Sequence, residues 1–201
     1  VYNSIKLTDK RIGELLARLE KDNLKDSTII FFYADHGEGM PRGKTNGINY
    51  GYRVPFVIWF PEMYKHLSPW GTAGIVSDEL IDFTDLAPSI ISLAGGKIPN
   101  HMEGRPILGN KRATPIDYLH LSSDRSDNGI DMVRTVTDGK YVYSRNYMPF
   151  IPEARYIRYM AIGAINQQML KLFAEEKLNH SQKPLFEHSP SEFLVNIKND
   201  L

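Results

Sequence analysis

Two potential metal ligands and a lysine lie close together in the first quarter of the chain. Asp35 and His36 directly follow an apolar run at 28–33, and Lys44 comes eight residues after His36. An uninterrupted apolar run is typical of a buried strand, and ligands of open α/β sheets bind beyond the carboxyl ends of the strands. The spacing therefore predicts half of a site that handles an anion with the help of a metal ion.

The two candidate ligands suit different cations. A carboxylate such as that of Asp35 binds any hard divalent cation, whereas the imidazole of His36 is unusual for Ca²⁺ and more natural for Mn²⁺ or Zn²⁺. Neighbouring strand residues point to opposite faces, so both can bind one ion only where the chain turns, and Gly37 allows such a turn. The alternative interpretation is a turn-capping Asp35 beside a buried, hydrogen-bonded His36.

Lys44 adds a positive charge to this pair. An ammonium beside a metal ion can bind a tetrahedral oxyanion and stabilise charge on a leaving oxygen, an effect of roughly 2.7–4 kcal/mol on the barrier. Arg42 is a candidate for a second anion contact. The alternative for both is simple exposure, because the stretch 37–51 contains five glycines and one proline and is predicted to be a long loop.

Hydrophobic periodicity predicts the elements around these residues. Ile12, Leu15, Leu16 and Leu19 have helical spacing, with Thr8 as N-cap and Asp9 in the first turn. Gly95-Gly96 ends a second helix. The predicted elements of the first half are a helix at 5–22, strands at 29–33 and 54–60, a short helix from 61, a brief strand at Val76 and a helix at 85–93.

Alternating residues in the second half predict a small antiparallel sheet packed by a helix. Asp138-Gly139 indicates a hairpin between two of its strands. Arg125 is predicted in a polar loop between the first two strands, and a charged loop of this kind is ordinarily exposed. The predicted elements are strands at 116–121, 132–136, 141–143 and 193–197, and a helix at 154–177 that buries the aromatic side chains of Tyr156, Tyr159 and Phe173.

The composition excludes several classes of partner. Lys and Arg total 24, as do Asp and Glu, so the net charge of zero gives no attraction to nucleic acid or an anionic membrane surface. No apolar stretch approaches the 18 or so residues of a membrane span, and there is no cysteine for a nucleophile or disulfide. Val1 begins no visible signal peptide, and both ends look cut, so we expect an excised portion of a longer protein.

Several ordered motifs resemble the sulfatase family. Residues 26–61 read DSTIIFFYADHGEGMPRGKTNGINYGYRVPFVIWFP, which is similar to the family's D-H/N-G strand end, its G-K loop and its G-x-R-V-P return to the sheet. Residues 76–104 resemble the D-L-x-P-T/S helix and the following I-P-x-x-x-x-G turn. Residues 133–149 and 190–200 resemble the C-terminal subdomain and the ending of bacterial exported sulfatases, so the resemblance covers nearly the whole chain.

The resemblance implies roles for the residues singled out above. Asp35 and His36 correspond to the family's D-H/N pair, which binds a divalent metal, usually Ca²⁺. Lys44 corresponds to the lysine that contacts the sulfate and helps stabilise the leaving oxygen. The family's nucleophile is a formylglycine hydrate made in a C/S-x-P-S-R motif, and this motif is absent. The string His188-Ser189-Pro190-Ser191-Glu192 has the wrong residues and the wrong position.

The resemblance also implies the fold, the partners and the compartment. The expected fold class is α/β, with the C-terminal part of an alkaline-phosphatase-like α/β sandwich at 1–110 and a C-terminal α+β subdomain at 111–201. The expected partners are a sulfated small molecule or glycan, read by Lys44, Arg42 and Arg125, and the missing N-terminal half that carries the formylglycine. The family's exported members suggest a periplasmic or secreted protein, and the fragment alone is expected to be inactive.

Two other functions stay open at this point. A phosphohydrolase or phosphonate hydrolase of the same superfamily shares the D-H-G strand end, although such enzymes more often use two metals, and the G-K loop followed by R-V-P favours sulfate. A noncatalytic paralogue that binds carbohydrate is the second alternative. The absence of the nucleophile motif upstream of Val1 as well would favour this second alternative.

Overall fold

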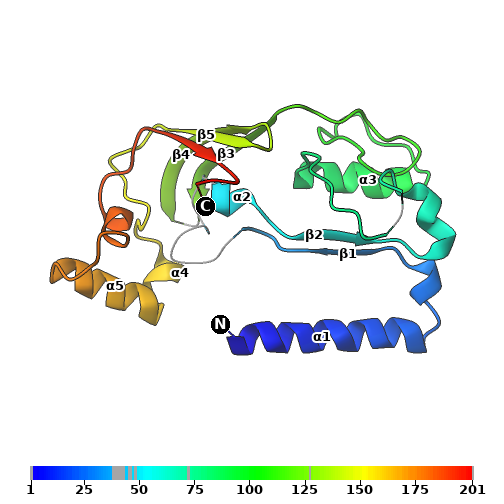
Figure 1. Cartoon of the computed structure of the whole chain (residues 1–201), viewed down its shortest axis with the longest axis horizontal. Helices are drawn as coiled ribbons and strands as arrows, with labels where there is room; N and C mark the ends of the chain where they lie inside the picture. Colours follow the sequence, from blue (N-terminus) through cyan, green and yellow to red (C-terminus); the bar gives the residue numbers. More distant parts are fainter. Residues whose placement is uncertain are drawn as a thin grey trace. The chain divides into compact units, whose positions relative to one another are not determined.

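The computed structural model describes residues 2–37, 44, 47, 49–71, 73–126 and 128–200. These residues form two compact units, each described by itself below (Figure 1). The first unit contains residues 1–32, 56–77 and 82–114, and the second contains residues 33–55, 78–81 and 115–201. The predicted domain boundary at 110/111 stays a prediction.

The first unit combines helices with a short two-stranded sheet. Its elements are α1 (Tyr2–Lys21), η1 (Lys25–Ser27), β1 (Ile30–Tyr33), β2 (Phe56–Trp59), η2 (Glu62–Leu67), η3 (Phe83–Asp85) and α3 (Leu86–Leu93), with the last residue of β1 counted in the second unit. Within the described residues, no helix is long and apolar enough to cross a membrane. The strand predicted at Val76 was wrong, since that residue lies in irregular chain and is exposed.

Helix α1 begins three residues earlier than predicted. Thr8 and Asp9 therefore lie inside the helix, and their predicted places at the N-cap and in the first turn were wrong. The helix ends where Asn23 takes a left-handed conformation with φ of 56°, and the Leu24 amide then donates to the Leu19 carbonyl at 2.9 Å. Asparagine tolerates this conformation better than most residues, which explains the stop after Lys21.

Strands β1 and β2 pair with each other and run in opposite directions, as the return of the chain in Figure 1 shows. The Phe31 and Phe56 rings lie 6.4 Å apart, and Phe56 lies 6.2 Å from Phe83 of η3, so aromatic contacts join the strands to this turn. The prediction that the first strand is buried on both faces was wrong for the described residues, because Phe32 is 45% exposed.

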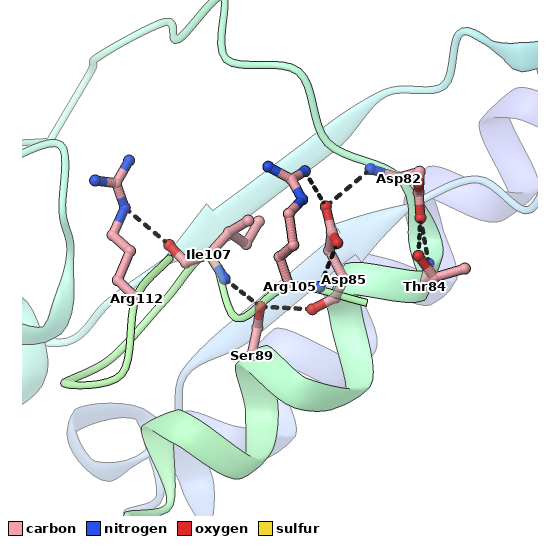
Figure 2. Close-up of polar contacts among 7 residues, drawn as sticks. All are labelled: Asp82, Thr84, Asp85, Ser89, Arg105, Ile107 and Arg112. Carbon is pink, nitrogen blue, oxygen red and sulfur yellow. Dashed lines mark hydrogen bonds and ion pairs between the residues drawn. The ribbon is translucent and has the colours of Figure 1, made fainter. Parts of the chain in front are cut away.

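A buried carboxylate holds the start of α3 to the turn that follows the helix (Figure 2). Asp85 is 1% exposed and accepts hydrogen bonds from the Arg105 amide at 2.7 Å and from Arg105 Nη2 at 2.6 Å. Its Oδ2 also accepts from the Asp82 amide at 3.4 Å, and the Asp82 side chain in turn caps η3 at Thr84. The ion pair thus joins two segments twenty residues apart.

Ser89 and Gly104 complete this junction. The Ser89 hydroxyl donates to the Asp85 carbonyl at 2.6 Å and accepts from the Ile107 amide at 2.8 Å. A Cβ on Gly104 would lie 1.8 Å from the Thr84 carbonyl oxygen, so only glycine permits this approach. The arrangement explains in physical terms why the D-L-x-P-S helix and the glycine of the following turn occur together.

The second unit is built on a four-stranded sheet. The strand order is β3-β4-β5-β6, and all neighbours are antiparallel, which confirms the predicted C-terminal sheet (Figure 1). Its elements are α2 (Asn49–Tyr52), β3 (Leu119–Ser126), β4 (Gly129–Thr137), β5 (Tyr141–Asn146), α4 (Arg158–Ala161), α5 (Ala164–Ala174), η4 (Lys183–Phe186) and β6 (Glu192–Asn196).

The predicted hairpin connects β4 and β5, with Thr137 opposite Val142. Gly139 adopts a positive φ of 83°, and Asp138 Oδ1 accepts from the amides of Lys140 at 2.8 Å and Tyr141 at 2.7 Å. These hydrogen bonds from Tyr141 and Lys140 hold the pKa of the Asp138 carboxyl below its ordinary value. Because β4 ends at Thr137 and β5 begins at Tyr141, the turn is longer than the two residues predicted.

The predicted helix at 154–177 is interrupted. Gly163 separates α4 from α5, as expected of a glycine that weakens a helix. Tyr156 and Tyr159 are 68% and 59% exposed, so the prediction that they belong to the core was wrong. Phe173 does pack internally, with its ring stacked 5.1 Å from that of Phe186.

The Asp85 junction generates a stability prediction. Asp85→Asn should lower the free energy of unfolding by about 3–5 kcal/mol, because it leaves the Arg105 guanidinium without its buried counter-charge. Urea denaturation measures this change. The control is Glu62→Gln, which breaks an exposed pair with Lys65 and should cost less than about 1 kcal/mol. Equal losses in the two variants would contradict the role given to Asp85.

Candidate functional site

The segment after β1 is held against the segment that precedes β2. The Ala34 amide donates to the Pro55 carbonyl at 3.4 Å, and the Gly37 amide donates to the Gly51 carbonyl at 2.9 Å. Asp35 and His36 lie between these two bonds, at the end of the strand where the sequence predicted them. Because the backbone turns here, adjacent residues can present their side chains to the same side.

The structure brings the Asp35 and His36 side chains together. Asp35 Oδ1 lies 3.6 Å from His36 Nε2, with the aspartate side chain 90% exposed and the histidine side chain 35% exposed. His36 Nδ1 lies 2.9 Å from the Gly37 carbonyl oxygen. A carbonyl only accepts, so Nδ1 carries a proton, and in the neutral form of this tautomer the lone pair lies on Nε2. That lone pair and the carboxylate oxygen are therefore neighbours.

This pair fits part of a metal site. A separation of 3.6 Å suits two neighbouring ligands of one ion, because metal–ligand distances are about 2.0–2.6 Å. The bond from Nδ1 to a backbone carbonyl is also the usual way to orient a ligating histidine. Among the residues that the structure describes, no group of three or more His, Cys, Asp or Glu side chains is placed to hold a metal ion. Two ligands do not complete a coordination sphere, so further ligands would have to come from elsewhere.

The Lys44 ammonium lies over an aromatic ring that the sequence did not mark as part of the site. Its Nζ is 4.9 Å from the centroid of the Tyr159 ring, a cation–π contact. Both residues belong to the second unit, as do Asp35 and His36. The predicted convergence of Asp35, His36 and Lys44 on one anion stays a prediction.

Gly47, three residues after Lys44 in the sequence, packs directly on the sheet of the second unit. Gly47 is buried, and a Cβ on it would lie 2.8 Å from the Cβ atoms of both Ser123 and Val133. The Thr135 hydroxyl donates to the Gly47 carbonyl at 2.8 Å. Since this hydroxyl has one proton, the Ser144 hydroxyl at 2.8 Å must donate to Thr135. The glycine backbone therefore rests directly on β3 and β4.

A buried tyrosine and a small cavity lie beside the contact between Gly47 and the sheet. The Tyr52 hydroxyl is buried, and burial raises the pKa of Tyr52 to about 12. A cavity of about 20 Å³ adjoins Gly47 and is lined by Asp131, Arg155 and Asn146 among others. That volume holds about one water molecule and is too small for a substrate. Arg155 Nη2 and Asp131 Oδ2 lie 3.4 Å apart there, with both side chains less than a tenth exposed.

The two predicted substrate-binding arginines have different outcomes. Arg42 lies outside the described residues. Arg125 lies in β3 opposite Ile130, so its predicted place in a loop was wrong. A bulge between Ser123 and Arg125 leaves Asp124 unpaired in the ladder, and Asp124 instead forms an ion pair with Arg134 at 2.6 Å. Arg125 is exposed, and its contact with substrate stays a prediction.

Comparisons with known proteins agree with the motifs. The family model described as Sulfatase matches residues 1–96. An ulvan-active sulfatase from Formosa agariphila is 36% identical over 205 residues, which cover 100% of this chain and 33% of the relative. An arylsulfatase from Clostridium perfringens is 33% identical over 59% of this chain and 25% of the relative. The chain thus spans a third or less of the length of these relatives.

The fold has counterparts among solved structures. A 2-O GAG sulfatase structure is similar over 86% of this chain and 39% of its own, with a TM-score of 0.57 and 23% sequence identity. This likeness concerns the fold, and it confirms the expected fold class.

The raised pKa of Tyr52 predicts a pH dependence of stability. The unfolded phenol ionises near pH 10 and the folded one near 12, so burial of the neutral phenol contributes stability below pH 10 that is lost as the pH rises to 12. Thermal unfolding from pH 8 to 12 should show a steeper alkaline decline for wild type than for Tyr52→Phe. Tyr2→Phe, at an 89% exposed position, is the control. Parallel curves for wild type and Tyr52→Phe would contradict the assignment.

Proposed function

The chain belongs to the sulfatase family, and from this premise we propose that it is the C-terminal part of a sulfuric ester hydrolase. In this proposal the chain supplies two metal ligands and the cation that binds sulfate, and the formylglycine nucleophile comes from another part of the protein. The similarity of the whole chain to one third of an ulvan-active sulfatase supports this division.

Exposed apolar surface supports a larger parent protein. Leu15 and Leu16 of the apolar row on α1 are 61% and 44% exposed, and Phe32 of β1 is 45% exposed. The apolar stripe of an amphipathic helix is ordinarily buried against another element. We assign the covering of these faces to the portion of the protein that carries the nucleophile.

Asp35 and His36 would hold a divalent metal ion, for which Ca²⁺ is our choice. The observation that carries this assignment is the 3.6 Å separation of Asp35 Oδ1 and His36 Nε2, with Nδ1 already bonded to the Gly37 carbonyl. A bound cation would attract the sulfate group and withdraw charge from it. The role of the Gly37 carbonyl is to hold the imidazole ring so that Nε2 faces the same side as the carboxylate.

Lys44 would bind a sulfate oxygen and stabilise charge on the leaving oxygen. A sulfate monoester carries a single negative charge, which a divalent metal ion and one ammonium would both attract. The substrate we propose is a sulfated glycan. The relatives named ulvan-active sulfatase and N-acetylglucosamine-6-O-sulfatase support this substrate class through their names.

The role of Lys44 is tested in the full-length protein. Lys44→Ala should lower kcat on an aryl sulfate by about 10²–10³-fold, the usual effect of losing one donor that stabilises a developing anion. Steady-state kinetics measures the change. Lys10→Ala serves as the control, because Lys10 lies on exposed α1 in a weak pair with Glu14. Turnover of Lys44→Ala within a few-fold of wild type would remove Lys44 from this role.

The metal assignment has its own test. After chelation of the full-length protein, Asp35→Ala should require more than about tenfold higher Ca²⁺ than wild type to bind one ion, as measured by calorimetry, and to regain activity. Asp9→Ala on α1 is the matched control. The same Ca²⁺ affinity in wild type and Asp35→Ala would show that Asp35 is not a ligand.

A further inference from the structure

We infer that Tyr159 is a positioning residue for Lys44, a role that rests on the proposed function. The ring of Tyr159 lies 4.9 Å from the Lys44 ammonium, well inside the distance of about 6 Å at which a cation is attracted by an aromatic face. The inference concerns how the ammonium is held before it meets the anion, and it places a residue of α4 in the sulfate site.

The geometry leaves the ammonium free to bind an anion. A lysine Nζ has three N–H donors, and a ring face covers one side of it. The remaining donors point away from the ring, so an anion can approach without displacing Tyr159. Because the ring carries no formal negative charge, it orients the ammonium without neutralising it, as a carboxylate partner would.

The contact with Tyr159 lies at the charged end of Lys44, and a glycine packed on the sheet follows three residues later in the sequence. This glycine, Gly47, is fixed on the sheet by the hydrogen bond from Thr135 and by the contact that excludes any Cβ. A long lysine side chain loses rotamer freedom when it binds. A head group that already rests on Tyr159 loses less of it on binding the anion, so the bound state costs less.

The backbone segment that carries Tyr159 is well packed. Ile157 and Met160, on either side of it, are 1% and 3% exposed, and the Arg158 amide donates to Asn128 Oδ1 at 3.0 Å. A Cβ on Gly129 would lie 2.7 Å from Ile157 Cγ1, so β4 and this segment are in close contact. The Tyr159 ring, in contrast, is 59% exposed, and its removal should leave the core intact.

A purely structural contact would behave differently from a positioning contact. If the ring only contributed to folding, its loss would lower stability and would affect catalysis equally whether or not residue 44 is a lysine. If the ring positions the ammonium, its loss should affect catalysis only when Lys44 is present. The effect should also grow with the basicity of the leaving oxygen, since the ammonium stabilises charge there.

The experiment is a double-mutant cycle in the full-length protein. Tyr159→Leu, Tyr159→Phe, Lys44→Ala and the double variant Tyr159→Leu/Lys44→Ala are compared on 4-nitrophenyl sulfate and on phenyl sulfate, whose leaving group is more basic. Tyr156→Leu is the control, because Tyr156 lies three residues earlier and is 68% exposed. Thermal unfolding of each variant checks that the fold is retained.

Tyr159→Leu should lower kcat/KM about threefold to tenfold, with the larger loss on phenyl sulfate. Tyr159→Phe keeps an aromatic face and should stay within about twofold of wild type, as should Tyr156→Leu. In the Lys44→Ala background, Tyr159→Leu should cause no further loss.

Each contrary result has one meaning. Equal losses from Tyr159→Leu in both backgrounds, or no loss in either, would overturn the inference while leaving the proposed function intact, provided that Lys44→Ala is impaired. An unimpaired Lys44→Ala would contradict the role of Lys44 in the proposed function, and the inference would fall with it.

Discussion

The arrangement of the second unit depends on a contact that only a glycine allows. The backbone of Gly47 rests on β3 and β4, where a single added carbon would collide with the Cβ atoms of Ser123 and Val133. A peptide group pressed against a sheet brings a carbonyl that needs a hydrogen-bond donor. This requirement accounts for a buried sheet face that carries hydroxyls, since Thr135 donates to the Gly47 carbonyl and is itself joined to Ser144.

This contact ties two distant parts of the sequence together. Gly47 and Thr135 are 88 residues apart, and Tyr159 lies still farther along the chain from Lys44. Gly47 is therefore supported by the C-terminal sheet and the Lys44 ammonium by Tyr159 of α4, while Asp35 and His36 are placed by the backbone at the end of β1. In the proposed enzyme, the metal ligands and the cation would have separate supports.

Local patterns in the sequence predicted the elements that local forces determine. Alternation predicted β4, where Val133 and Thr135 are buried and Arg134 is exposed, and the glycine after Asp138 predicted the hairpin. Contacts between distant residues left no such pattern. Nothing near Tyr159 indicates that a lysine lies over its ring, so its hydrophobic character suggested the core. Arg125 was predicted in a loop because charged residues surround it. In the structure β3 resumes its pairing with β4 beyond the bulge at Asp124, so Arg125 lies in the strand.

Burial and partners distinguish the aspartates that the family-like motifs contain. Asp85 is 1% exposed, and both of its carboxylate oxygens accept hydrogen bonds from Arg105, so it serves to hold α3 to the following turn. The Asp35 side chain is 90% exposed and faces His36 Nε2, while the other ring nitrogen of His36 bonds to the Gly37 carbonyl. The buried oxygens of Asp85 are therefore occupied by Arg105, whereas those of Asp35 lie open to solvent. The same residue type therefore stabilises the fold at one position and is available for chemistry at the other.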